Sequence, residues 1–197
     1  LITAAKSHRD THEEDDVEEF ATLRDLLVKG ELCLLPQGDA AAPTAAQGGL
    51  ALAYLPGDFT QTHWDVNSAL VSRALDWLQP AAEEHALDLF CGVGNFSLPL
   101  ARRAHCVHAL EGDPGMTARV ADNARRNALD NVVARTLNLL APEVILPRAD
   151  IAILDPPRAG AKAVCEALAR SRVKRLVYIS CHPATLARDA QILHAAG

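Results

Sequence analysis

Hydrophobic positions change their spacing along the chain, and these changes mark the predicted helices and strands. In residues 66–78 apolar residues recur every three or four positions, which predicts an amphipathic helix that Pro80 ends. Beyond it, short apolar runs alternate with helical patterns. The predicted strands are 86–90, 106–110, 151–154 and 176–180, and the predicted helices are 97–104, 114–127, 161–169 and 184–195. This alternation indicates an α/β fold with a mostly parallel sheet and helices on both faces.

The first sixty residues have a different, mixed pattern. Their predicted elements are a helix (10–29), a strand (31–36), a loop (39–49) and a second strand (50–55). We therefore divide the chain into a small α+β segment, residues 1–60, and an α/β domain, residues 61–197. The segment by itself says nothing about chemistry.

Composition narrows the class of protein further. With 197 residues, 49% of them apolar and 22% charged, the chain suits one full-sized globular domain with a small appendage, which argues against disorder. It contains no apolar run of about 18 residues and no basic stretch leading into a hydrophobic one. We expect a cytoplasmic protein without a membrane partner. Because the chain starts with Leu1 and stops at Gly197 just after a helical pattern, we also expect it to be a piece of a longer protein.

The net charge of -6 argues at first against an anionic partner such as nucleic acid. Most of that charge lies in an acidic stretch within residues 1–25, and the remainder is close to neutral. Charge therefore neither predicts nor excludes an RNA partner.

The cysteines do not suggest a disulfide framework, because the five of them are widely spaced without a CxxC pair. The cluster of His105, Cys106 and His108 could suggest a metal. Strand alternation, however, sends His105 and Cys106 to opposite faces, which leaves too few convergent ligands. We expect no metal site.

A glycine turn follows the predicted strand 86–90, in the sequence LDLFCGVGNF. Gly92 and Gly94 let the backbone approach a ligand and direct amide groups at it. A dinucleotide fingerprint would have its third glycine where Ser97 stands. Glu111 ends the next strand, where a carboxylate can accept hydrogen bonds from the ribose of a nucleoside cofactor. The alternatives are an ordinary tight turn and a surface carboxylate.

Two further strands end in residues that can carry chemistry. Asp155 begins the sequence DPPR, whose prolines make a rigid rim at the ligand edge of the sheet. Cys181 leaves the last strand just before a helix, whose positive end would stabilise a thiolate and favour a nucleophile. The alternative for Cys181 is a buried small hydrophobic residue. Its competitor, Cys91, is expected to pack beside the cofactor.

Together these sequences resemble the RNA uracil-5 methyltransferases, which use S-adenosylmethionine. The resemblance covers residues 58–197, and the motifs DFTQ, LDLFCGVGNF, ALEGDP, DNARRNALDNV, DPPRAG and SCHPATLARD occur in the order of the family. The sequences of these motifs are most similar to the branch of the family that acts on bacterial 23S ribosomal RNA, and the tRNA branch is the near alternative. The resemblance implies a Rossmann-like methyltransferase fold, a monomer, an RNA substrate and S-adenosylmethionine as the methyl donor.

The resemblance also implies the roles of individual residues. Cys181 would be the nucleophile, and Asp155 would lie near both the target base and the donor. Gly92 and Gly94 form the turn against which the donor would bind. The other donor-binding residues would be Gln61, Phe90, Asn95, Glu111 and Asn138, with Asp155 shared between the two sites.

The chain departs from the family in several ways. His182 stands where the family has Asn; it could tune the thiol, but we favour a replacement of a turn residue. The general base of the family and the last two strands of its sheet come after the point where this chain stops. An iron-sulfur cluster is expected only in an N-terminal region outside it. Two other classes remain open, a nicotinamide-dinucleotide-binding domain and a non-catalytic RNA-binding module.

Overall fold

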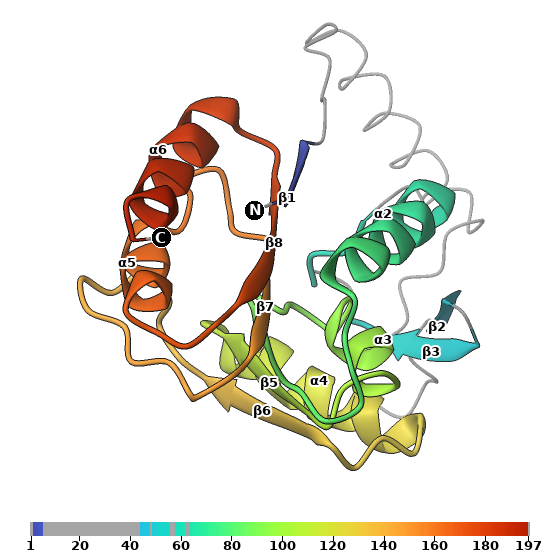
Figure 1. Ribbon diagram of the computed structural model, residues 1–197. Coiled ribbons are helices and arrows are strands. Elements are labelled where there is room, and N and C mark those ends of the chain that lie inside the picture. The colour runs from blue at the N-terminus through green and yellow to red at the C-terminus, as the bar shows by residue number, and fades with distance from the viewer. Residues whose placement is uncertain (1, 6–43, 48, 56–57, 62–63, 197) are drawn as a thin grey trace, which may run out of the picture.

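The computed structural model describes residues 2–5, 44–47, 49–55, 58–61 and 64–196 (Figure 1). The predicted helix 10–29 and strand 31–36 lie outside these residues. Among the described residues, no helix has the length and apolar character needed to cross a membrane.

A six-stranded sheet lies at the centre of the described structure. Its strands have the order β1-β8-β7-β4-β5-β6, and every neighbouring pair runs parallel. The carboxyl ends of the strands therefore meet at one edge. The strands are β1 (Ile2–Ala5), β4 (His85–Leu89), β5 (Cys106–Glu111), β6 (Val132–Thr136), β7 (Ile151–Leu154) and β8 (Arg175–Ser180).

Helices cover both faces of this sheet, which confirms the predicted architecture (Figure 1). One face packs against α5 and α6, and the other against α2 and α3, while α4 packs along β5 and β6. The helices are α2 (Trp64–Leu78), α3 (Ser97–Ala101), α4 (Pro114–Arg126), α5 (Lys162–Ala169) and α6 (Pro183–His194).

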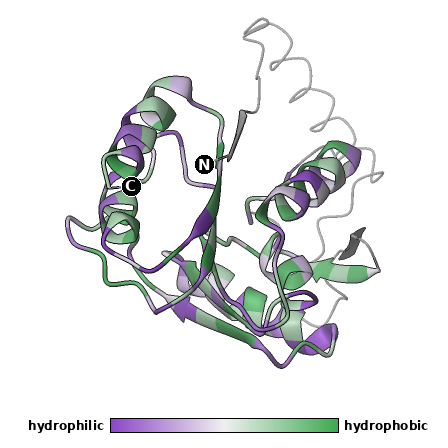
Figure 2. Cartoon of the chain, in the orientation of Figure 1, coloured by the Kyte–Doolittle hydropathy of each residue, from purple (hydrophilic) through white to green (hydrophobic). Residues whose placement is uncertain are grey.

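The short strand β7 explains why both faces need cover. Its four residues are all buried; Ile151 and Ile153 belong to the core under α2, whereas Ala152 and Leu154 belong to the core under α5. Successive side chains of a strand point to opposite faces, so an apolar run of this kind demands a helix on each side. On α2 the hydrophobic and hydrophilic positions alternate, as expected for a helix with one solvent-exposed face (Figure 2).

A two-stranded hairpin lies outside the main sheet. The strands β2 (Thr44–Gln47) and β3 (Leu50–Ala53) pair antiparallel. The second agrees with the predicted strand 50–55, but the prediction of a loop over 39–49 is wrong for residues 44–47. Alanine has a low strand propensity, so the sequence TAAQ gives no strand signal without its partner.

Two asparagines of α4 and its C-terminal end hold the hairpin in place. Asn123 accepts a hydrogen bond from the Ala53 backbone amide at 2.9 Å and donates to the carbonyls of Ala53 and Val93, also at 2.9 Å. Asn127 exchanges two hydrogen bonds with the Ala51 backbone, both at 2.8 Å. Each amide side chain therefore takes the place of a neighbouring strand along β3.

Candidate functional site

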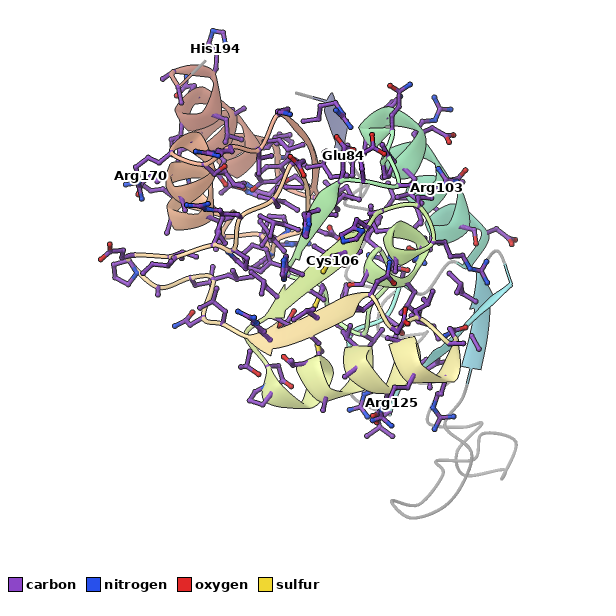
Figure 3. All side chains as sticks on the ribbon, turned by 60° about the horizontal axis from the view of Figure 1, so that its bottom comes forward. Glu84, Arg103, Cys106, Arg125, Arg170 and His194 are labelled. Atoms are coloured by element: carbon purple, nitrogen blue, oxygen red, sulfur yellow. The ribbon has the colours of Figure 1, made fainter. Side chains whose placement is uncertain are left out.

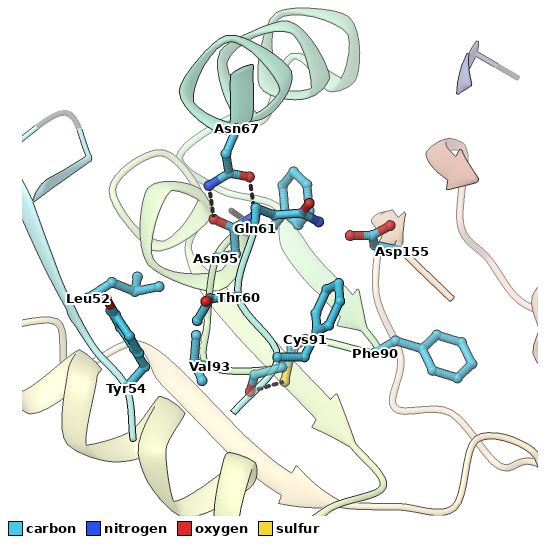
Figure 4. Close-up of a pocket in the computed structure, with 13 residues that line it drawn as sticks. Leu52, Tyr54, Thr60, Gln61, Asn67, Phe90, Cys91, Val93, Asn95 and Asp155 are labelled. Carbon is cyan, nitrogen blue, oxygen red and sulfur yellow. Dashed lines mark hydrogen bonds between the residues drawn. The ribbon is translucent and has the colours of Figure 1, made fainter. Parts of the chain in front are cut away.

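A pocket of about 370 Å³ opens at the carboxyl edge of the sheet, beside the turn that follows β4 (Figure 4). Its walls come from five parts of the chain: the hairpin, the segment before α2, α2 itself, the turn after β4 and the turn after β7. The lining residues are Leu52, Tyr54, Phe59, Thr60, Gln61, Asn67, Phe90, Cys91, Gly92, Val93, Asn95, Phe96 and Asp155.

The glycine turn after β4 has an unusual backbone. Phe90, Gly92 and Gly94 all have positive φ angles, of 65°, 55° and 98°. Phe90 is the costly member, because a bulky side chain disfavours this region. A Cβ added to Gly92 would meet no heavy atom within 4 Å, whereas one added to Gly94 would contact Leu98 and Val120 at 3.6 Å. Gly92 thus leaves open space outside the turn, while Gly94 permits close packing inside it.

Glu111 ties this turn to the end of β5. One carboxylate oxygen accepts hydrogen bonds from the backbone amides of Gly112 and Asp113, at 2.7 and 3.1 Å. The other accepts from the Gly92 amide at 3.1 Å. Glu111 does not line the pocket but lies beside its glycine wall, at the carboxyl edge where the sequence placed it.

Asn138 also lies beyond the pocket, after β6. It is exposed, and its side-chain oxygen accepts a hydrogen bond from the Leu140 amide at 3.0 Å. Because β6 neighbours β5, Asn138 and Glu111 belong to the same carboxyl edge. Predicted donor-binding residues therefore continue from the pocket across β5 to β6.

A pair of asparagines spans the top of the pocket. The side-chain amides of Asn67 on α2 and Asn95 in the glycine turn donate to each other, at 2.7 and 3.0 Å. Figure 4 shows the Gln61 side chain pointing toward the Asp155 carboxylate, while the Phe90 ring points away from the other lining residues. Gln61, Asn95 and Asp155 thus present polar groups to one space.

The segment that carries Gln61 is fixed to α4 by an ion pair. The Asp58 carboxylate lies 2.6 Å from Nε of Arg119. This carboxylate also accepts a hydrogen bond from the Leu55 amide at 2.7 Å. This contact explains the aspartate of the sequence DFTQ, which positions the pocket wall.

Asp155 and Cys181 follow two neighbouring strands, β7 and β8. Asp155 is half-buried, and its backbone amide donates to the Leu89 carbonyl at 3.3 Å. Cys181 is exposed between β8 and α6 and does not line the pocket. The structure thus brings Asp155 into the pocket and leaves the Cys181 thiol accessible at the adjoining strand end.

His182 begins the helix that follows Cys181. Its ring Nδ1 accepts a hydrogen bond from the Thr185 amide at 3.4 Å, and its backbone amide donates to Ser180 Oγ at 3.0 Å. This is the arrangement of an N-cap residue, a position that Asn also favours. The capping contact supports the interpretation that His182 replaces a turn residue.

Helix α6 also clamps the loop that follows Asp155. Thr185 donates to the Arg158 carbonyl at 3.1 Å, and Arg188 donates to the Ala159 carbonyl at 3.0 Å. Asp189 accepts from the Ala161 amide at 2.6 Å. The sequence ATLARD after Cys181 therefore has a structural role, which is to fix the loop DPPRAG.

A buried carboxyl group lies beneath the glycine turn. Asp88, the fourth residue of β4, is 1% exposed, and Ser97 Oγ donates to it at 2.5 Å. Burial, together with the like charges of Asp155 and Glu111, raises the pKa of Asp88 to about 7, although hydrogen bonds from Ser97 oppose the shift. Burial also raises the pKa of Cys91, well above its ordinary value, so this thiol is a poor nucleophile.

The sequence reasoning missed several walls of the pocket. Leu52 and Tyr54 come from the segment that showed no chemistry, and Asn67 lies on a helix read only for its apolar face. Phe59 and Thr60 adjoin Gln61 in a motif that was noted for Gln61 alone. Cys91 lies within the glycine turn and lines the pocket, and its packing beside the cofactor stays a prediction.

Comparison with solved structures identifies the class of protein to which this fold and site belong. The structure is similar to the Pyrococcus abyssi tRNA (uracil-54, C5)-methyltransferase solved in complex with S-adenosyl-L-homocysteine, with a TM-score of 0.70, 27% identity and coverage of 78% of this chain and 38% of that one. It is also similar to the Thermus thermophilus 16S rRNA N2 G1207 methyltransferase in complex with AdoMet and guanosine, with a TM-score of 0.60, 25% identity and coverage of 82% and 47%. The fold is that of the Rossmann-like methyltransferases.

The sequence comparisons then define the family. Residues 49–145 match the model of the tRNA (Uracil-5-)-methyltransferase family. The chain is 52% identical over 141 residues to the 23S rRNA (uracil(1939)-C(5))-methyltransferase RlmD of Chromohalobacter salexigens, covering 72% of this chain and 30% of that protein. For RlmD of Pseudomonas entomophila the identity is 45% over 175 residues, covering 83% and 39%. The chain belongs to the RNA uracil-5 methyltransferase family and spans about a third of the length of these curated relatives.

Proposed function

We propose that this chain forms the donor-binding and nucleophile-bearing part of an enzyme that methylates carbon 5 of a uridine in RNA. The favoured RNA is 23S ribosomal RNA. One observation carries the proposal. Within a chain of this family, Gln61, Asn95 and Asp155 come from three different motifs and meet in one pocket beside the glycine turn. The names of the curated relatives favour the ribosomal substrate, and the solved tRNA enzyme keeps tRNA as the alternative.

The carboxyl edge suits S-adenosylmethionine, which would supply an electrophilic methyl group. The open space over Gly92 lets a ligand lie against the turn. The Glu111 carboxylate, now occupied by backbone amides, can accept hydrogen bonds from ribose hydroxyls. Asn138 lies further along the same edge, toward the expected adenine end. Gln61 and Asp155 lie where we expect the methyl group and the target base.

The exposed thiol of Cys181 supplies what uracil chemistry needs. Carbon 5 of uracil is a poor nucleophile, but addition of the thiolate to carbon 6 turns the ring into an enolate that attacks the methyl group. A base then takes the proton from carbon 5, the bond between sulfur and carbon 6 breaks, and the thiolate is regenerated. The uridine has to leave its stack for both faces to be reached. We assign the base to no described residue.

The cellular setting follows from this function. The curated relatives are named for bacterial 23S rRNA, which is cytoplasmic, and we propose that location for this protein. We also propose a monomeric state. We keep the division between residues 1–60 and a catalytic domain of residues 61–197 as a proposal, in which the first part contributes β1 to the sheet and Leu52 and Tyr54 to the pocket of the second.

Donor binding is the first test. Calorimetric titration of the chain with S-adenosylhomocysteine should give one site, and NADH should not compete for it. Glu111→Gln should weaken that binding at least tenfold, whereas Glu143→Gln, an exposed carboxylate outside the pocket, should leave it unchanged. Competition by NADH would favour a nicotinamide-dinucleotide-binding protein instead.

Covalent capture tests the nucleophile. The complete gene product is incubated with S-adenosylmethionine and a 23S ribosomal RNA fragment that carries 5-fluorouridine, since fluorine cannot leave carbon 5 as a proton does. We expect a denaturation-resistant adduct that maps to Cys181 and is absent in Cys181→Ala. An adduct with tRNA instead would move the substrate to tRNA. Confirmed donor binding without any adduct would contradict the covalent mechanism and favour a non-catalytic RNA-binding module.

A further inference from the structure

A second cluster of reactive side chains lies at the opposite edge of the sheet from the pocket. His85 is the first residue of β4, and Cys106 is the first residue of β5, directly paired with it in the parallel ladder. His108 follows Cys106 by two positions and so points to the same face of β5. One nitrogen from each histidine and the sulfur of Cys106 all lie within 4.8 Å of one another.

The cluster contains a polar atom whose bonding is incomplete. Nδ1 of His108 is buried and has no hydrogen-bond partner among the described residues. A buried nitrogen left in this way carries a free-energy cost, which a ligand at that nitrogen would remove. The rings of His85 and His108 stack with centroids 6.2 Å apart and 18° between their planes, so both imidazoles lie close to the Cys106 thiol.

The segment 105–108 alone holds too few ligands for a metal, because strand alternation sends His105 and Cys106 to opposite faces. The third ligand comes from a neighbouring strand: His85 is 21 positions before Cys106 in the chain but faces it across the ladder. His105 precedes β5 and is exposed, with its ring centroid 5.1 Å from that of His85.

We propose that His85, Cys106 and His108 bind a borderline divalent metal ion of the Zn²⁺ type, with solvent as the fourth ligand. Two imidazoles and one thiolate are ligands that Zn²⁺ prefers, at roughly 2.0–2.1 Å for nitrogen and about 2.3 Å for sulfur. Such bond lengths place tetrahedral ligands some 3.3–3.7 Å apart. The three donors, which all lie within 4.8 Å of one another, are already close to that spacing.

The position of this site sets its role. It lies at the amino ends of β4 and β5, whereas the glycine turn and Glu111 lie at their carboxyl ends. A metal here connects two central strands and does not reach the pocket. Its effect is structural: binding to the folded chain, and not to the unfolded chain, raises the free energy of unfolding.

Cobalt titration tests the site directly. A tag-free chain, stripped with EDTA and kept reduced, is titrated with Co²⁺ and then with Zn²⁺. One equivalent of Co²⁺ should produce the visible bands of tetrahedral cobalt together with a thiolate-to-cobalt charge-transfer band, and Zn²⁺ should displace it. The melting temperature should rise with Zn²⁺ concentration. A chain without stoichiometric cobalt bands would overturn the proposal.

Matched variants locate the ligands. Cys106→Ser should abolish the charge-transfer band, and His85→Gln should weaken Zn²⁺ binding at least tenfold. Cys181→Ser, which changes an exposed thiol, and His194→Gln, at the far end of α6, should do neither (Figure 3). Melting of each variant in EDTA shows whether it folds, and the two ligand variants check each other if one does not. Loss of the band in Cys181→Ser, or its persistence in Cys106→Ser, would place the metal elsewhere.

Discussion

Two aspartates of this molecule are equally buried but differ in their hydrogen bonds and in the charges around them. Asp189 on α6 is 0% exposed and accepts hydrogen bonds from Ala161, Tyr178 and Arg188. Asp88 on β4 is 1% exposed and, among the described residues, accepts hydrogen bonds from Ser97. It also faces the like charges of Asp155 and Glu111. The first is a well-satisfied structural anchor, and the second is a costly group.

The difference follows from what each aspartate supports. Asp189 fixes a loop, and a buried carboxylate does so best when its oxygens are fully hydrogen-bonded. Asp88 lies beneath the turn that borders the pocket, where Asp155 and Glu111 are placed for ligand chemistry. Perturbed carboxyl groups gather at functional sites for this reason. The carboxyl edge therefore carries an electrostatic cost that the clamp around Asp189 does not.

Asp189→Asn should have the largest effect on stability. The amide cannot accept all the hydrogen bonds that the carboxylate accepts, and it leaves the Arg188 guanidinium without its buried ion-pair partner. Because the Arg188 side chain is 43% exposed, the cost comes mainly from lost hydrogen bonds to the buried carboxylate, and at roughly 1.5–3 kcal/mol for each such bond we expect a loss of about 4 kcal/mol. Urea unfolding measures the change, with the exposed Asp130→Asn as a control that should alter the free energy of unfolding by less than about 0.5 kcal/mol. Equal effects of the two variants would show that Asp189 is not an anchor.

Asp88→Asn should change the pH dependence of stability. With the pKa of Asp88 raised from 3.8 to about 7, the folded chain binds more protons than the unfolded chain between these values, so stability falls as pH rises. Between pH 5 and pH 8 this group should lower the free energy of unfolding by about 3 kcal/mol.

Asp88→Asn should lack this fall in the free energy of unfolding. It should therefore gain stability relative to the natural chain as the pH rises. Urea unfolding at several pH values measures the two curves. Parallel curves would mean that Asp88 keeps an ordinary pKa.

Ser97→Ala should destabilise the chain by about 2 kcal/mol at pH 8, where the hydroxyl donates to an ionised carboxylate. Losing this hydrogen bond should also raise the pKa of Asp88, since the bond lowers it. The loss of stability should therefore be smaller at pH 5. Ser171→Ala, an exposed serine at the end of α5, serves as the comparison. A loss that does not vary with pH would separate Ser97 from the titration of Asp88.

Tyr178→Phe should have the smallest effect, about 1 kcal/mol. The phenol is one of several donors to Asp189, and phenylalanine keeps the packing of a ring that is 1% exposed. Thermal unfolding near neutral pH is sufficient, because burial and the neighbouring Asp189 raise the pKa of Tyr178 far above that range. A loss as large as that in Asp189→Asn would show that the tyrosine is the main partner.

The sequence predicted the regular part of the fold because each buried strand carries its own signal. Four apolar residues were enough to predict the strand 151–154. Asp155 and Cys181 could be predicted as site residues because each directly follows a predicted strand. What escaped were pairings between distant segments. The Asn123 and Asn127 contacts to β3, and the meeting of His85 with Cys106, depend on which strands are neighbours. The spacing of residues within one segment does not contain that information.

The hairpin contacts have a consequence for how the protein is made. Ala53 and Asn123 are 70 positions apart, so β3 leaves the ribosome well before the helix that receives it. At synthesis rates of about 5–20 residues per second, the hairpin waits roughly 4–14 s for its partner. The wall of the pocket that the hairpin forms is therefore not fixed in place until α4 has been translated. Competence to bind a ligand should arise later still, because β7 and the pocket residue Asp155 that follows it come after α4 in the chain.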